Sequence, residues 1–113
     1  YVCYVLRGKN GDLPDGTRIS RFRVTEADPP RIDPASETIL LTFLAGGHNG
    51  CDLQFGPDGY LYISLGDAAV PSPPDPLRTG QDVTDLHASI LRIDVDRQDP
   101  GLAYAIPKDN PFV

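Results

Sequence analysis

The sequence predicts an all-β protein made of antiparallel strands. Short stretches rich in aromatic and β-branched residues follow one another at close intervals, with turn signals between them. The 113 residues include 11 glycines and 12 prolines, which interrupt helices too often for long ones to form. A six-residue pattern also occurs twice. With 40% hydrophobic residues, the chain has enough apolar side chains to fold.

Six segments have the composition of strands. Residues 1–6 and 60–65 are the clearest, because tyrosine, valine, isoleucine and leucine dominate them. In residues 38–44, alternation predicts that Ile39, Leu41 and Phe43 share one face of a strand. The complete set of expected strands is 1–6, 18–25, 38–44, 51–55, 60–65 and 89–95.

The segments between these strands carry turn signals or many prolines. Turns are expected at Asn10-Gly11, at residues 14–16 and at the Gly-Pro-Asp-Gly sequence of residues 56–59. We expect a Pro-rich connection over residues 26–36 and a long loop over residues 66–82, which contains Pro71, Pro73, Pro74 and Pro76. Residues 85–88 have room for one helical turn, and residues 96–113 read as extended chain.

The repeated pattern is I-x-R-apolar-x-V, found at residues 19–24 and again at residues 90–95. Each copy follows an apolar strand, which predicts two consecutive sheets of three or four strands. Propellers are built from four-stranded blades, so the chain corresponds to about two blades. Residues 1–45 would be the end of one blade, and 46–113 the next, with its long loop at 66–82. Two blades cannot close a ring, so we expect a fragment of a larger chain.

The charge balance excludes two classes of partner. A formal net charge of −6 argues against nucleic acid, because phosphate binding needs a basic surface. It argues equally against an anionic membrane surface. We expect no membrane span, because no apolar run reaches the roughly 20 residues that a spanning helix needs.

The chain has two cysteines, Cys3 and Cys51. Two buried thiols and a disulfide both remain open from the sequence, since free cysteine packs like a small hydrophobic residue and export would permit oxidation. The spacing of cysteines and histidines does not match a structural zinc site.

Six short phrases between residues 48 and 112 form an ordered set. In this order and spacing they resemble the glucose/sorbosone dehydrogenase family, whose enzymes are six-bladed β-propellers. Residues before Gly46 are compatible with strands of a preceding blade. The phrases are His48-Asn49-Gly50, Phe55-Gly56-Pro57-Asp58-Gly59-Tyr60-Leu61-Tyr62, Leu65-Gly66-Asp67, Gly80-Gln81-Asp82, Ile90-Leu91-Arg92-Ile93-Asp94-Val95 and Ile106-Pro107-Lys108-Asp109-Asn110-Pro111-Phe112.

The resemblance implies an oxidoreductase that oxidises the anomeric hydroxyl of a sugar or aldose and transfers a hydride to pyrroloquinoline quinone (PQQ), which calcium polarises. By the same resemblance His48 is the general base, Asp67 orients it and Gln81 lies close to the quinone. An imidazole suits the first role, because it is a neutral base near pH 7.

The resemblance also implies partners and a location. The substrate is a small sugar, the electron acceptor is a molecule such as a cytochrome or a quinone, and the compartment is periplasmic or extracellular. The family's calcium ligands and the basic residues that hold the quinone carboxylates are expected in the parent chain, outside these residues. No metal ligand is therefore assigned here, and we expect the isolated fragment to be inactive.

Two departures from the family favour a different function. Its enzymes often carry an acidic residue just before the histidine, where this chain has Gly47, and the apolar Ala68-Ala69-Val70 follows Asp67. The alternative is a non-catalytic binding module of the hedgehog-interacting-protein type, which would use the acidic, Pro-rich loop at residues 70–82. Because the histidine is retained, the sequence alone favours the enzyme.

Simpler roles are open for the same residues. His48 reads equally as an exposed loop histidine, and Asp67 as a residue that caps a turn through its side chain. Gln81 and Asp82 fit the start of the turn at Asp85. His87 is expected to be exposed or packed at that turn. Asp94, Asp96 and Asp99 lack the spacing of a calcium-binding loop.

Overall fold

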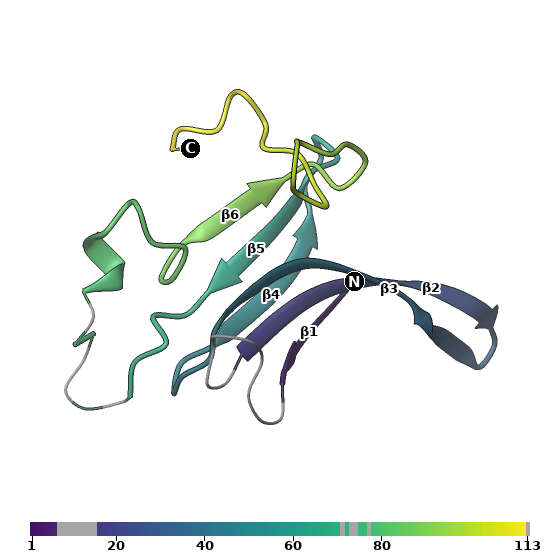
Figure 1. Cartoon of the computed structure of the whole chain (residues 1–113), viewed down its shortest axis with the longest axis horizontal. Coiled ribbons are helices and arrows are strands. Elements are labelled where there is room, and N and C mark those ends of the chain that lie inside the picture. The colour runs from purple at the N-terminus through teal and green to yellow at the C-terminus, as the bar shows by residue number, and fades with distance from the viewer. Residues whose placement is uncertain (7–15, 71, 73–74, 77, 113) are drawn as a thin grey trace.

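The chain forms two three-stranded antiparallel sheets, as the sequence predicts (Figure 1). The computed structural model describes residues 1–6, 16–70, 72, 75–76 and 78–112. Most of the region of the predicted turns at 10–16 lies outside the described residues. Pro71, Pro73 and Pro74 also lie outside them. The first sheet has the order β1-β2-β3 and the second β4-β5-β6. The strands are β1 (Val2–Val5), β2 (Gly16–Ala27), β3 (Pro30–Leu44), β4 (Gly50–Phe55), β5 (Leu61–Leu65) and β6 (Ile90–Ile93).

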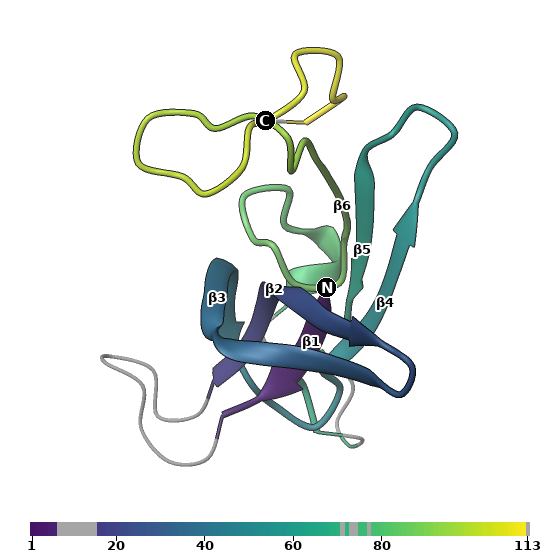
Figure 2. The same ribbon diagram turned by 90° about the vertical axis from the view of Figure 1, so that its right-hand side faces the viewer.

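The two sheets lie next to each other (Figures 1 and 2), and one hydrophobic core contains side chains from both. Alternate residues of β5 point into it, because successive side chains of a strand lie on opposite faces. This core is what fixes the second sheet, and the loops at its ends, against the first. Its main side chains are Ile19 and Phe43 from the first sheet and Leu61, Ile63, Leu65 and Ile93 from the second.

The predicted Pro-rich connection at residues 26–36 is wrong, because β2 and β3 continue through it as a long hairpin. Val24 pairs with Ile32, and Ala27 pairs with Pro30 next to the turn. Pro34 is accommodated because the register jumps from Arg21–Thr38 to Arg23–Asp33. Residues 34–37 therefore lie in a bulge, where proline loses no ladder hydrogen bond.

A second bulge changes which residues of β3 face the core. Ile19 pairs with Leu41 and Ser20 pairs with Ile39, so Leu40 is an extra residue in the ladder. Leu40 is only 6% exposed, whereas Ile39 is 43% exposed. The prediction that Ile39 shares a face with Leu41 and Phe43 is therefore wrong, because an extra residue shifts the alternation by one position.

The helical turn predicted at residues 85–88 is also wrong. The described residues contain one short 3-10 helix, η1 (Thr79–Gln81), and turns follow it. Asp82 accepts the backbone N–H of Thr84, and Asp85 accepts that of His87. Such side-chain bonds two residues along the chain compete with helix formation.

The C-terminal residues 96–112 are folded back in turns rather than extended, with Asp94 bridged to Ala105. Among the residues described, no helix is long and apolar enough to span a membrane.

Candidate functional site

The His48 and Asp67 side chains meet where the β4–β5 hairpin continues past its strands. The backbone N–H of His48 donates to the Ala69 carbonyl at 3.1 Å, and the N–H of Ala68 donates to the His48 carbonyl at 3.0 Å. These bonds extend the antiparallel ladder beyond Gly50, where the left-handed backbone (φ 82°) favours glycine. Two residues 19 positions apart in the chain are thereby held side by side.

The contact between the two side chains defines which form of the histidine is present. Nδ1 of His48 lies 2.9 Å from Oδ1 of Asp67. A carboxylate only accepts hydrogen bonds, so Nδ1 carries the proton and donates it. In the neutral ring Nε2 then holds the free lone pair. The His48 side chain is 47% exposed, so solvent and ligands can reach the ring.

Asp67 has two roles at once. Its Oδ1 also accepts the backbone N–H of Ala69 at 3.0 Å, which is the turn-capping role that the sequence left open. The hydrogen bond from Ala69 is the main influence that holds the pKa of the Asp67 carboxyl below its ordinary value; partial desolvation opposes it, and the bond from His48 adds to it. Asp67 is therefore an ionised acceptor that positions both the histidine and the 67–69 turn.

The backbone beside His48 leaves no room for a side chain. A Cβ atom on Gly47 would lie 2.4 Å from the Ala69 carbonyl oxygen, and one on Gly46 would lie 1.7 Å from that of Ala68. Ala68 itself has a left-handed backbone (φ 57°) and turns the chain over these glycines. The two sequence departures, Gly47 and Ala68–Val70, are thus parts of one steric arrangement.

Thr79 is a residue of this region that the sequence reading missed. It is buried, and its hydroxyl has two acceptors within reach, the Asp67 carbonyl oxygen at 3.4 Å and Asp75 Oδ1 at 3.3 Å. Asp75 holds it there by accepting the Thr79 backbone N–H at 2.9 Å. The sequence signal for the contact between Asp75 and Thr79 is an aspartate four residues before a threonine. η1 is thereby attached to the backbone of the candidate site.

Gln81 is not brought to the pair by hydrogen bonding in the part of the chain that is described. Its side-chain amide donates to the adjacent Gly80 carbonyl at 2.8 Å, and the side chain is exposed. A role for Gln81 in cofactor contact therefore stays a prediction.

His87 is packed rather than exposed, and it is not part of the pair. Its Nδ1 lies 2.7 Å from Asp85 Oδ1, and its Nε2 lies 3.2 Å from the Leu44 carbonyl oxygen. The ring also meets the edge of Phe43, with centroids 5.8 Å apart. His87 therefore attaches the loop before β6 to the end of β3.

The residues around the His48–Asp67 pair fit only part of what a quinone enzyme needs. The His48–Asp67 pair fits a base and its positioning group. Among the described residues, however, no three His, Cys, Asp or Glu side chains cluster as metal ligands would. Arg78 is the single Arg or Lys between residues 46 and 89, whereas the quinone carries several carboxylates. These residues alone therefore do not form a PQQ–calcium site.

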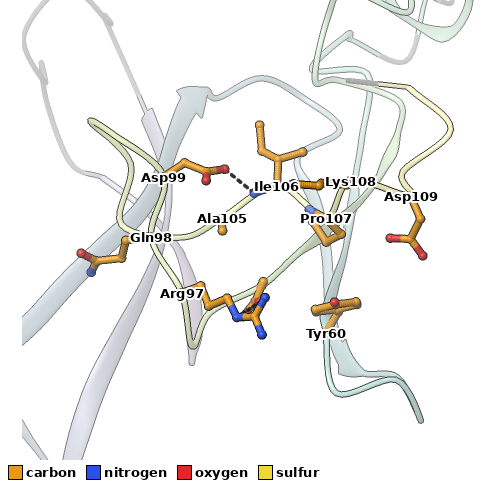
Figure 3. Close-up of a pocket in the computed structure, with 10 residues that line it drawn as sticks. Tyr60, Arg97, Gln98, Asp99, Ala105, Ile106, Pro107, Lys108 and Asp109 are labelled. Carbon is orange, nitrogen blue, oxygen red and sulfur yellow. Dashed lines mark hydrogen bonds and ion pairs between the residues drawn. The ribbon is translucent and has the colours of Figure 1, made fainter.

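A pocket of about 540 Å³ lies at the opposite end of β5 from His48 (Figure 3). Tyr60 and Asp109 line it, and its carboxylates already have partners: Asp99 accepts the N–H of Ile106 at 2.8 Å. Next to it, Arg92 donates to Asp58 and Asp109 and lies over the Tyr60 ring. We read this region as the anchor of the C-terminal segment, not as the functional site.

Comparison with known proteins gives one family. All residues, 1–113, match the model described as Glucose / Sorbosone dehydrogenase. Hedgehog-interacting protein of Mus musculus and of Homo sapiens are each 34% identical over 96 residues, which is 83% of this chain and 13% of theirs. HIPL1 protein of Arabidopsis thaliana is 35% identical over 102 residues, 78% of this chain and 14% of its own. The chain thus spans about an eighth of the relatives it matches.

Proposed function

The chain belongs to the glucose/sorbosone dehydrogenase family, and on that basis we propose that it is part of a propeller whose rim binds a protein partner instead of oxidising a sugar. The rim surface consists of residues 46–49 and the described residues of 66–89. The observation that carries the proposal is the closed backbone at Gly46 and Gly47. The position that bears an acidic side chain in the family's enzymes cannot hold one here without moving the 68–70 turn.

The relatives support the same function. The two mammalian proteins are named for interacting with Hedgehog, and they match 83% of this chain. A binding role requires a surface and no cofactor.

Within the rim surface, the described residues hold one another in place, which favours binding. Four aspartates in it accept hydrogen bonds from groups of the same rim surface: Asp67 from Ala69, Asp75 from Thr79 and Gly80, Asp82 from Thr84, and Asp85 from His87. A loop whose conformation is already fixed loses less entropy when a partner binds.

The chemistry of the surface indicates the kind of partner. Val70, Val83 and Leu86 are exposed, and Val83 is 74% exposed. They stand among the four aspartates and a single arginine. A partner face with apolar groups bordered by basic side chains complements this surface. Hedgehog is the first candidate, because the relatives' names supply it.

A binding measurement with a matched control tests the proposal. Purified Hedgehog signalling domain would be titrated against the full-length protein by surface plasmon resonance. We expect Val83→Asp with Leu86→Asp to weaken binding at least about tenfold, as loss of an apolar anchor does. Gln98→Asp, at an exposed polar position of the C-terminal segment and outside the rim surface, should leave binding unchanged. Absence of binding combined with sugar-dependent redox turnover would contradict the proposal.

Sugar oxidation is a second candidate, favoured by the His48–Asp67 contact. With Nδ1–H held by Asp67, Nε2 of His48 is free to accept the proton of a sugar hydroxyl, and the carboxylate stabilises the imidazolium that forms. The quinone and calcium would be held by residues beyond this chain, and an electron acceptor would complete the reaction. Loss of turnover in His48→Ala would support this candidate.

A location outside the cytoplasm is part of both proposals, because the family resemblance implies export. Separation of periplasmic or culture-medium fractions from cytoplasm, followed by immunodetection of the full-length protein, tests it. Recovery from the cytoplasmic fraction alone would contradict it.

A further inference from the structure

The two cysteines of this chain meet across the interface between the two sheets. Cys3 lies on β1 and Cys51 on β4, 48 positions apart. β1 and β4 run close together, with Cα atoms within 8 Å of each other. Both side chains are partly buried and pack against the same hydrophobic core.

We propose that Cys3 and Cys51 form a disulfide that joins the two sheets. The chain has two cysteines, and the long β2–β3 hairpin separates them in the sequence. β1 and β4 nevertheless bring them to the same part of the interface between the sheets. A disulfide needs Cα atoms about 4.4–6.8 Å apart and Cβ atoms that face each other. Neighbouring strands with Cα atoms within 8 Å, whose cysteines pack against the same core, come close to that geometry.

The reaction is an ordinary thiol–disulfide exchange. The two thiols lose two protons and two electrons, and an S–S bond forms between their sulfur atoms. The electrons pass to a small-molecule disulfide of the surrounding compartment, such as oxidised glutathione, whose S–S bond breaks to give two thiols.

The surroundings of Cys51 favour a long-lived bond. Burial, followed by the neighbouring Cys3 thiol, raises the pKa of Cys51 to about 12. A thiol with a high pKa is a poor leaving group, so exchange that must expel it is slow. The other route, attack on the Cys51 sulfur with Cys3 as the leaving group, is hindered because both side chains are partly buried against the core. We therefore expect a structural cross-link instead of a rapidly reversible redox switch.

Peptide mapping of the full-length protein tests the proposal directly. The protein is incubated with oxidised glutathione, alkylated, digested with trypsin without reduction and analysed by mass spectrometry. Because trypsin cuts after Arg7, Arg31 and Arg78, Cys3 and Cys51 fall in separate peptides. We expect one linked species that contains both cysteines and separates after treatment with dithiothreitol.

Two further measurements make the result decisive. Cys3→Ser should remove the linked species and leave Cys51 alkylated, and reduction of the wild type should lower its thermal unfolding midpoint while leaving that of Cys3→Ser unchanged. Recovery of both cysteines as separately alkylated or glutathionylated peptides from the folded wild type would overturn the proposal.

Discussion

The two histidines of this chain are held in different ways. His48 has one partner, Asp67, and an exposed ring with a free Nε2. His87 has partners at both nitrogens, Asp85 and the Leu44 carbonyl, and its side chain is only 12% exposed. A residue whose groups are all bonded within the protein serves the fold, whereas one with a free, accessible nitrogen is available to a ligand.

This difference predicts effects of different size on stability. His87→Ala removes two hydrogen bonds and a ring contact, so it should lower the free energy of unfolding by about 1–3 kcal/mol. His48→Ala removes one exposed bond and should change it by about 0.5 kcal/mol or less. Urea unfolding of the full-length variants measures both. Equal effects would show that His87 does not anchor the loop before β6.

The second prediction at the residue scale concerns Gly47. A Cβ at this position would lie 2.4 Å from the Ala69 carbonyl oxygen, so Gly47→Ala must displace the 68–70 turn. We expect a loss of about 1–3 kcal/mol, the usual cost of overpacking, and weaker binding at the rim surface. Gly80→Ala is the control, because its nearest neighbour would be 3.4 Å away, at the end of a side chain. If Gly47→Ala were as stable as this control, the closed backbone would be disproved.

At the scale of the strands, bulges determine how far a strand extends and which of its residues face the core, and the local sequence pattern does not reveal them. Six apolar segments were recognisable because β-branched and aromatic residues are concentrated in them. The hairpin over residues 26–36 was missed because prolines weigh against a strand. Pro30 is tolerated as the first residue of β3, and Pro34 because it lies in a bulge, where no ladder N–H is needed. The orientation of β3 was missed because the extra residue at Leu40 leaves no mark in the sequence.

The bulge at Leu40 can be tested with two neighbouring residues. Leu40→Ala should lower the free energy of unfolding by about 2–5 kcal/mol, because it leaves a cavity in the core. Ile39→Ala, on the exposed side, should cost less than about 1 kcal/mol. Chemical denaturation of the full-length protein measures the difference. The reverse ranking would restore the simple alternation of Ile39, Leu41 and Phe43.

The candidate site was predictable in part for physical reasons that can be named. His48 and Asp67 flank two strands joined by a tight Gly-Pro-Asp-Gly turn, and a hairpin necessarily brings its two ends together. Thr79 and His87 were not predictable in the same way. Their contacts, to Asp67 and to Leu44, depend on how a long loop folds back over the sheet. The meeting of Cys3 and Cys51 depends on sheet packing and was likewise undecided by sequence.

At the scale of the whole molecule, corresponding residues of the two repeat copies differ in whether they are buried. Ile19 is buried while its counterpart Ile90 is 74% exposed, and Val95 is buried while its counterpart Val24 is exposed. Each copy thus has one apolar residue toward the other sheet and one away from it. This is the arrangement of stacked blades, in which each sheet packs on both faces.

The exposed side of the second sheet should therefore be covered in the full-length protein. Ile90→Asp is expected to lower the free energy of unfolding by about 3 kcal/mol or more, because a charge would be buried without a partner. Val83→Asp is the matched control, since Val83 is equally exposed in this chain but lies on the rim surface. A small and equal effect of both substitutions would mean that no further sheet packs against β6.

The most direct test of the central claim is a redox assay of the full-length protein supplied with PQQ and calcium. Dye reduction would be followed with a panel of aldoses, for the wild type and for His48→Ala. A binding propeller predicts no sugar-dependent reduction in either protein, while binding to the protein partner is retained. Sugar-dependent reduction by the wild type that disappears in His48→Ala would contradict the claim and establish the chain as part of a dehydrogenase.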